Sequence, residues 1–522
     1  MTSSVISRRT LVAGESRPWL FQSDLKAVDR SHGSVPLNSL GTAVMLLLTM
    51  AAAAYAGQAF MAVVTGRHLY WDTSWFLVKL LSERHIAVWN AHGWRDFFVG
   101  RFGTFAYQET PTLLAMRLRV RDPHLLSLIY GVTLFSFKPL GLLLCYRFAR
   151  DKRLVIFPLL TLFAGTMNSE ASIGSETHLM SALFWPALFG LMYCREFKGW
   201  VLAAMIAVSA PLLVCYETMA MLGLFLCAAC IYRLIAVARG RRERWLSWVF
   251  FGWYSLGVIF GALAIAFPRD ATNRSGFLKS TFFFLHADHI GARVSVLVLL
   301  LCAAVVLIPE RCRRILNTLT AIGTLGSLAI PLYIILHPQA TNFGTNVVAR
   351  TMHASVCFVL ALAFIALHFH LLQVGAAQYK RLFVMAAVLG ICQSGWSLVA
   401  SSQWSNMLTV LRAELRTHAG AVALEDTLLV QSVVDGQPIR ELHADWPLMS
   451  LSILYSDNRT VRTIVFADTA RFLPFDPYDP GSLPNLHRFG FSYAPYVAAL
   501  AKKRSGIRKE NIVPLSPATG SR

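Results

Sequence analysis

The chain has 522 residues, of which 55% are hydrophobic and only 15% are charged, and its mean hydropathy is +0.52. This composition excludes an ordinary soluble protein and is typical of a helical membrane protein with many spans. The net charge of +20 does not indicate nucleic-acid binding, because basic cytoplasmic loops of a membrane protein produce the same excess. No basic stripe with interleaved aromatic residues stands outside the apolar segments.

The N-terminus is polar through Leu37 and lacks a short apolar core followed by a cleavage site, so we expect no removable signal peptide. All nine cysteines lie within or beside apolar runs. This placement predicts neither a disulfide framework nor a metal site. Cys227 and Cys230 have CxxC spacing, but inside an apolar span we interpret them as helix-packing residues.

The chain contains about eleven apolar runs that are long enough to cross a bilayer, for which about 20 residues are needed. The stretch 199–237 is too long for one span, and we divide it at Tyr216–Glu217. The predicted spans are 39–64, 125–147, 154–172, 178–194, 199–215, 218–237, 245–267, 290–309, 315–336, 352–373 and 382–401.

The distribution of lysine and arginine predicts the orientation of these spans, because basic loops stay on the cytoplasmic side. With the N-terminus inside, every short inside loop is basic, whereas the outside loops 168–178 and 216–217 contain no lysine or arginine. An odd number of spans then exports the C-terminal tail. The inside loops are 147–153, 194–198, 232–244, 310–314 and 378–381.

The predicted fold class is an all-α polytopic membrane protein with a small α+β C-terminal region. Residues 1–37 form a cytoplasmic tail, 38–402 the transmembrane core, and 403–522 a periplasmic region. Within the periplasmic region, 404–418 predicts a helix and 463–468 a strand.

The first outside loop, 65–124, is the other large exported element. We expect two amphipathic helices there that lie in the membrane interface, one capped by Thr73 and one that begins at Pro111. Trp71 and Trp75 would serve as interfacial anchors.

Ionisable residues at membrane depth are candidates for a functional site, and on this topology they gather at the outer rim. Glu170 and Glu176 also fit an ordinary solvated turn, and His368 and His370, near the inner end of a span, are interpreted as structural. The candidates are Asp72, Glu109, Glu170, Glu176, His178, Glu217, Arg269, Arg274, Lys279 and Arg350.

Acids, arginines and interfacial helices at one membrane surface suit a transferase with a lipid-phosphate-linked donor. An aspartate can act as general base on an acceptor hydroxyl, while arginine or lysine stabilises the departing phosphate. The sequence has no GxGxxG or GxxxxGK[ST] motif for a nucleotide donor.

The segment WDTSWF, with Asp72 a few residues beyond the first span, resembles the GT-C superfamily of integral membrane glycosyltransferases. The large first outside loop, the basic inside loops and the exported C-terminal region resemble that superfamily too. The resemblance implies a polyprenyl-phosphate-linked sugar donor and a catalytic role for Asp72. The loop has no paired Asp-Asp or Asp-Glu, and the resemblance covers roughly residues 39–240.

The leading hypothesis is a glycosyltransferase of the bacterial inner membrane that modifies a cell-envelope glycan, lipid or protein on the outer face. Asp72 would be the base, and Glu109 or Glu217 a second acid or a metal-binding group. Phosphate binding is assigned to Arg269, Arg274, Arg350 and, less strongly, Lys279. The cofactor is left open, with a divalent cation as one option. The alternatives are a glycan or lipid transporter or flippase, and a non-catalytic envelope assembly protein.

Overall fold

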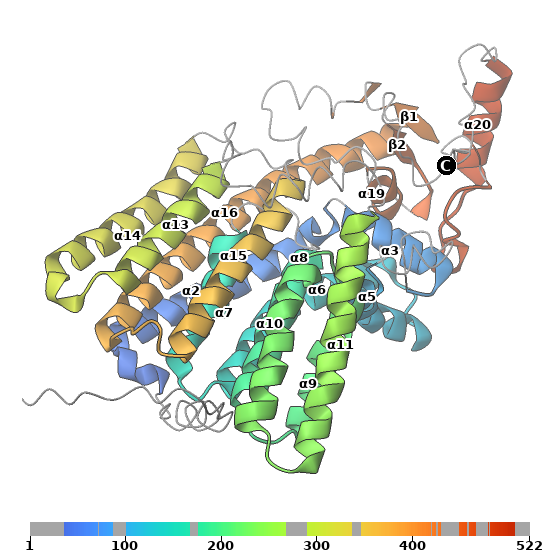
Figure 1. Ribbon diagram of the computed structural model, residues 1–522. Helices are drawn as coiled ribbons and strands as arrows, with labels where there is room; N and C mark the ends of the chain where they lie inside the picture. The colour runs from blue at the N-terminus through green and yellow to red at the C-terminus, as the bar shows by residue number, and fades with distance from the viewer. Residues whose placement is uncertain are drawn as a thin grey trace, which may run out of the picture.

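The protein is described by a computed structural model that is almost entirely helical (Figure 1). The structure describes residues 36–70, 72–86, 101–166, 176–267, 290–336, 346–418, 420–423, 426–427, 429, 448–456, 459–465, 479 and 481–506.

Each apolar run identified in the sequence contains helix. The helices formed by these runs are α2 (Thr42–Val64), α6 (Pro123–Phe148), α7 (Ile156–Thr166), α8 (Glu176–Tyr193), α9 (Gly199–Ser209), α10 (Met219–Tyr232), α11 (Arg241–Ala266), α13 (Ile290–Leu307), α14 (Arg313–Leu336), α15 (Asn346–His368) and α16 (Ala376–Thr417). Short 3-10 turns lie at Leu37–Leu40 (η1), Arg67–Leu69 (η2), Lys152–Val155 (η3), Pro211–Val214 (η4) and Glu310–Cys312 (η7), and a π-helical turn at Arg233–Val237 (η5) follows α10.

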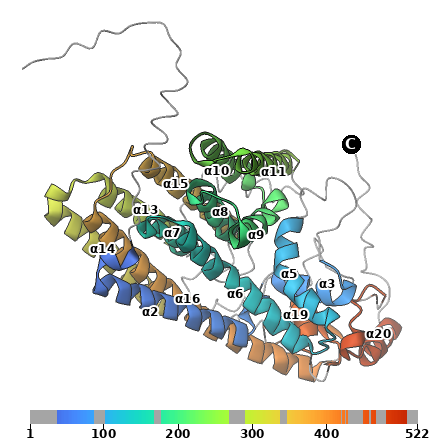
Figure 2. The ribbon, with the colours of Figure 1, turned by 90° about the horizontal axis from the view of Figure 1, so that it is seen from below.

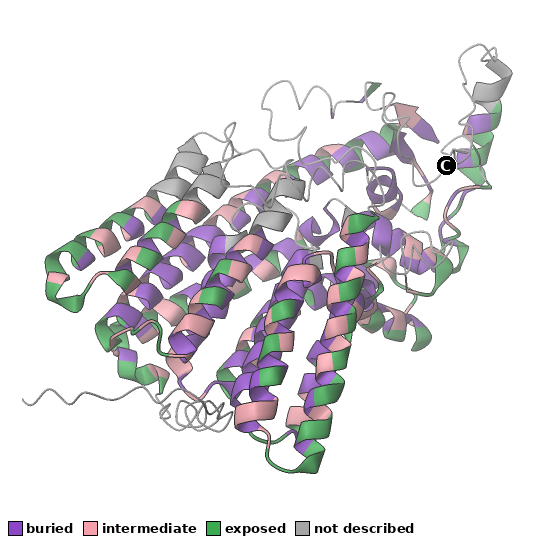
Figure 3. Ribbon diagram, in the orientation of Figure 1, coloured by how far each residue is buried: buried purple, intermediate pink, exposed green. Residues whose placement is uncertain are grey.

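Five helical stretches in the described part of the chain are long and apolar enough to cross a membrane: 42–64, 123–148, 219–237, 241–266 and 376–417. Large apolar side chains are exposed on several of the helices, among them Ile259 of α11 and Leu325 of α14. The helices of the bundle carry exposed residues along their outer faces, drawn in green in Figure 3. Apolar surface of this extent is costly in water and suits a lipid environment. The protein is therefore a multi-pass helical membrane protein.

The 42-residue helix α16 is about 63 Å long at 1.5 Å per residue, roughly twice the hydrocarbon thickness of a bilayer. Its first half packs along α2, as Figure 2 shows. The buried α2 residues Val44, Ala51 and Gln58 recur every seven positions, which keeps one face of α2 against its neighbours. The boundary expected at 402 falls inside α16, so the helix expected at 404–418 is a continuation of the last span.

The division within 199–237 is confirmed, and Pro211 explains it. Helix α9 ends at Ser209, the turn η4 follows, and α10 starts at Met219. Proline lacks the N–H that a continuing helix needs. The connection therefore presents Tyr216 and Glu217 between two apolar helices.

One end of the bundle, which we call the basic end, gathers the connections 147–155, 194–198, 233–244, 308–314 and 369–381. Arg153 lies over the Tyr379 ring at 4.7 Å, and the Gln378 amide donates to the carbonyls of Val305, Val306 and Ile308 at 2.9–3.2 Å. These contacts hold the ends of distant helices together. The predicted basic loops thus share one end of the protein (Figure 1).

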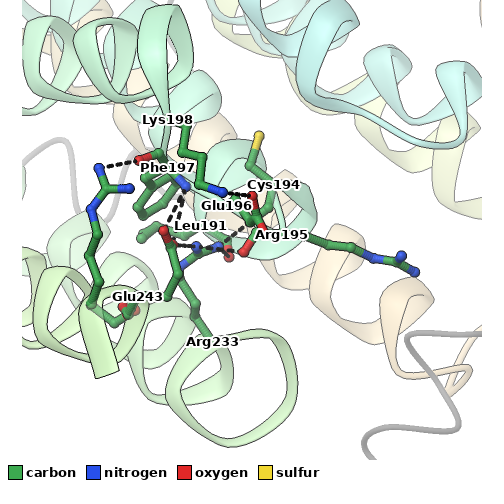
Figure 4. Close-up of polar contacts among 10 residues, drawn as sticks. Leu191, Cys194, Arg195, Glu196, Phe197, Lys198, Arg233 and Glu243 are labelled. Carbon is green, nitrogen blue, oxygen red and sulfur yellow. Dashed lines mark hydrogen bonds and ion pairs between the residues drawn. The ribbon is translucent and has the colours of Figure 1, made fainter. Parts of the chain in front are cut away.

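A buried ion pair organises the basic end (Figure 4). Arg233 Nη2 lies 2.7 Å from Glu243 Oε2, with the two side chains 0% and 6% exposed. Arg233 also donates to the backbone carbonyls of Leu191, Cys194 and Arg195, so it satisfies acceptors at the C-terminal end of α8. Glu243 in turn accepts the backbone N–H of Phe197 at 3.1 Å.

The opposite end carries the first loop and the C-terminal region, which share one apolar core. The first loop contains α3 (Asp72–Glu83) and α5 (Phe102–Arg117). The C-terminal region contains β1 (Ala421–Ala423), α19 (Leu448–Leu454), β2 (Thr463–Val465), η11 (His487–Phe489) and α20 (Ala494–Gly506). Strands β1 and β2 pair in parallel, with Val422 opposite Ile464. The first loop and the C-terminal region therefore pack together as one unit.

Two details of the first loop differ from expectation. Helix α3 starts at Asp72, so Thr73 lies inside the helix, and the apolar side of α3 is buried by protein rather than by lipid: Trp75 is 8% exposed and Leu77 0%. Helix α5 begins at Phe102, and Pro111 lies in its middle. Tertiary packing explains both differences, because α3 lies against α19 and α5 against α6 and η4.

Candidate functional site

Asp72 lies shortly after the first span, at the start of the first helix of the first loop. Helix α2 ends at Val64, and Asp72 is the first residue of α3, where a negative charge is favoured by the helix dipole. The side chain of Asp72 lies outside the described residues.

The turn η2, which precedes Asp72, is anchored by two buried basic residues. Arg67 is 1% exposed and donates to the Ser397 hydroxyl of α16. His68 is also 1% exposed, and its Nε2 lies 2.9 Å from the Ser127 hydroxyl of α6. Burial lowers the pKa of His68 to about 4, so its imidazole is neutral at pH 7. The start of α3 is thereby tied to two membrane helices.

Helix α3 meets α5 through aromatic side chains. The rings of Phe76 and Phe105 are 4.4 Å apart between centroids, and Trp75 packs on Phe76 at 5.0 Å. Phe76 follows Asp72 by one helical turn. Residues four apart share a face of a helix, so Glu109 follows Phe105 on the same face of α5, whereas Arg101 is the N-cap residue of that helix.

Glu109 is 0% exposed. Removal of a carboxylate from water costs several kcal/mol unless it is paired or protonated, so a buried acid is a strong functional candidate. The polar residues Thr104, Gln108 and Thr112 of α5 are buried as well. A polar side of α5 therefore faces the interior of the protein.

The N-terminal end of α5 rests on the broken connection between α9 and α10. The Thr104 hydroxyl donates to the Cys215 carbonyl at 2.9 Å. A Cβ on Gly103 would lie 2.1 Å from the Pro211 carbonyl oxygen, so only glycine permits this approach.

Glu217 lies in the same connection between α9 and α10. Its Oε1 accepts a hydrogen bond from Arg101 Nη2 at 3.1 Å, with the two side chains 13% and 12% exposed. The Arg101 guanidinium also covers the Tyr216 ring at 4.5 Å. The buried second oxygen of Glu217 accepts no hydrogen bond from any described residue. Arg101, which the sequence analysis did not single out, thus holds one oxygen and leaves the other available.

His178 belongs to a separate polar group deeper among the helices. Its ring packs on His353 of α15 at 4.9 Å between centroids, and His353 Nε2 is hydrogen-bonded to the Ser181 hydroxyl. Lys138 of α6, another residue that the sequence analysis missed, lines a cavity of about 20 Å³ together with Ser181 and His353. The position of Lys138 in an apolar span was the sequence signal that could have identified this residue.

The structure therefore packs α3, the helix of Asp72, against α5, which carries Glu109, and Arg101 at the N-terminal end of α5 pairs with Glu217. His178 belongs to a separate group. Other candidates lie outside the described residues: Glu170, Arg269, Arg274 and Lys279 entirely, and Glu176 and Arg350 in their side chains, although their backbones belong to α8 and α15. Within the described ranges, no group of three or more His, Cys, Asp or Glu residues could hold a metal ion.

No protein-family model matches the chain, and comparisons with curated proteins and with solved structures also found no match.

Proposed function

We propose that the protein is a membrane glycosyltransferase that moves a sugar from a polyprenyl-phosphate-linked donor to a cell-envelope acceptor. The observation that supports this best is the meeting of α3, α5 and the α9–α10 connection, which gathers the helix of Asp72, the buried Glu109 and the Arg101–Glu217 pair. The likeness of this arrangement to the GT-C superfamily rests on the position of Asp72 after the first span.

The proposed topology has eleven spans in the inner membrane of a bacterium. The basic end would face the cytoplasm under the positive-inside rule, and the opposite end would face the periplasm. The shared core of the first loop and C-terminal region supports an odd number of spans, because both then emerge on one side.

In the proposed reaction, Asp72 accepts the proton of an acceptor hydroxyl. The hydroxyl oxygen forms a bond to the anomeric carbon, and the bond from that carbon to the phosphate oxygen breaks. The electron pair leaves with the lipid phosphate, which Arg269, Arg274, Arg350 and Lys279 would stabilise. Glu109 and the open oxygen of Glu217 would orient the acceptor or hold a divalent cation.

The test compares cells that make the wild-type chain, no chain, or an Asp72→Asn chain, and it measures envelope glycans by mass spectrometry. Loss of a general base lowers the rate by about 10² to 10⁴-fold, so we expect Asp72→Asn to match the deletion. Glu83→Gln, which changes an exposed acid at the other end of α3, is the matched control and should restore the wild-type glycans. A folded Asp72→Asn chain that restores them fully would eliminate the catalytic assignment.

The transport alternative predicts charged residues deep in the spans, and Lys138 is one. The cavity beside it, however, has a volume of about 20 Å³, enough for about one water molecule. The assembly alternative relies on a separate C-terminal partner-binding domain, whereas this region packs into the core of the first loop. Both observations favour the transferase.

A further inference from the structure

A pocket of about 600 Å³ lies on the opposite end of the protein, between the first loop and the C-terminal region. Its volume falls in the range typical of small-molecule sites. We call it the arginine pocket, because five arginines line it together with three apolar residues. The lining is Arg84, Arg117, Arg119, Arg121 and Arg488, with Met116, Val120 and Phe489.

The described lining of the pocket is positively charged. The described residues that line it include no Asp or Glu, and all five arginines are exposed. Among the described residues, Glu83 pairs with His85 at 3.5 Å. Asp122 caps α6 through the His124 N–H and faces Arg459 at 3.8 Å. The two acids next in sequence to Arg84 and Arg121 thus have partners outside the lining of the pocket.

The backbone conformation at two of these arginines supports a functional role for their side chains. Arg84 and Arg119 adopt left-handed conformations, with φ of 61° and 69°. This conformation costs a non-glycine residue about 1 kcal/mol or more, whereas glycine adopts it freely. Long cationic side chains therefore stand at two positions where the backbone alone favours glycine.

The ligand chemistry follows from the guanidinium group. Its planar fork donates two parallel hydrogen bonds to a phosphate or a carboxylate. Several guanidinium groups around one pocket match a ligand with more than one phosphate or carboxylate group. The buried Met116 and Phe489 supply an apolar floor. We propose that the arginine pocket binds a phosphate- or pyrophosphate-bearing ligand.

The arginine pocket is separate from the Arg101–Glu217 pair. The arginine pocket contacts the C-terminal end of α5, whereas the Arg101–Glu217 pair lies at its N-terminal end. Sixteen residues of helix separate Arg101 from Arg117, a distance of about 24 Å. The inference does not depend on the proposed transferase activity.

The experiment uses the full chain in phosphatidylcholine nanodiscs and titrates it with inorganic pyrophosphate, with calorimetry and the thermal unfolding midpoint as readouts. A second arm replaces part of the lipid with phosphatidylglycerol and measures the midpoint alone. The double variant Arg117→Gln/Arg488→Gln removes one arginine from each side of the pocket. The control, Arg241→Gln/Arg244→Gln, removes the same charge from exposed positions at the basic end.

We expect the double variant to bind pyrophosphate about 100-fold more weakly than the wild type, because each lost charge-assisted contact costs about tenfold. The control should bind as the wild type does. Without ligand, the double variant should unfold at the same or a higher temperature, since it relieves repulsion among like charges. A purely structural role would instead lower this midpoint.

The two arms separate the sources of the phosphate. Pyrophosphate binding that the double variant loses supports a soluble phosphate ligand. A midpoint rise with phosphatidylglycerol alone, again lost in the double variant, supports a lipid headgroup. Equal responses of the wild type and the double variant in both arms overturn the proposal.

Discussion

The two ends of the protein use arginine in opposite ways. At the basic end, Arg233 is fully buried, paired with Glu243 and bonded to three backbone carbonyls. At the opposite end, five exposed arginines surround a hollow and form no ion pair with any described residue. In the first arrangement the N–H groups of the guanidinium bond to the fold, whereas in the second they are accessible to a ligand. Substitutions at the basic end should therefore change stability, whereas substitutions in the arginine pocket should change ligand binding.

The largest expected effect is the loss of Glu243. Glu243→Ala leaves Arg233 charged and buried without its carboxylate, which costs about 3–5 kcal/mol of unfolding free energy. The measurement is equilibrium unfolding in mixed micelles. Glu196→Ala is the control at the same end, because Glu196 pairs with Lys198 at 2.7 Å but both side chains are exposed; it should change nothing measurable. Equal losses in the two variants would contradict the structural role of Arg233.

The second prediction concerns pH at the opposite end. The pKa of His68 is lowered from 6.5 to about 4 by burial, so the unfolded chain takes up a proton below pH 6.5 while the folded chain does not. Stability is therefore complete above pH 6.5 and falls as the pH drops toward 4, by about 3 kcal/mol for this group. Measured at pH 7 and at pH 4.5, the wild type should lose more stability than His68→Gln. Identical losses would show that His68 is solvated.

Much of the helical framework could be predicted from the sequence, because long apolar runs and basic connections are local signals. The break near Glu217 and the helix expected from Thr73 belong to this class. The start of α5 could not be predicted, since Pro111 suggests a beginning and only packing against η4 extends the helix back to Phe102. Nor could the pairing of Arg101 with Glu217, 116 residues away. The arginine pocket is lined by both Arg84 and Arg488, and no local sequence pattern predicts that such distant residues share one pocket.

The third prediction tests the packing that supports the start of α3. A Cβ on Gly131 would lie 2.8 Å from the His68 ring. Overpacking of this kind costs about 1–3 kcal/mol, so Gly131→Ala should destabilise the protein. Gly57→Ala in α2 is the matched control, since open space surrounds that position and alanine favours helix. A stable Gly131→Ala variant would show that His68 has room to move.

The smallest expected change in stability, and the sharpest contrast between fold and ligand, comes from Arg119→Gly. Glycine accepts the left-handed backbone at φ 69°, and the substitution removes one charge from the arginine pocket. Unfolding free energy should stay constant or rise by about 1 kcal/mol, while pyrophosphate binding weakens about tenfold. Arg459→Gly is the control at the same end. Arg459 also has a left-handed backbone, with φ 55°, but its Nη1 donates to the Phe489 carbonyl at 2.8 Å, so its loss should destabilise the protein. If both variants lose stability alike, the arginines of the pocket serve the fold, and the difference between the two ends of the molecule disappears.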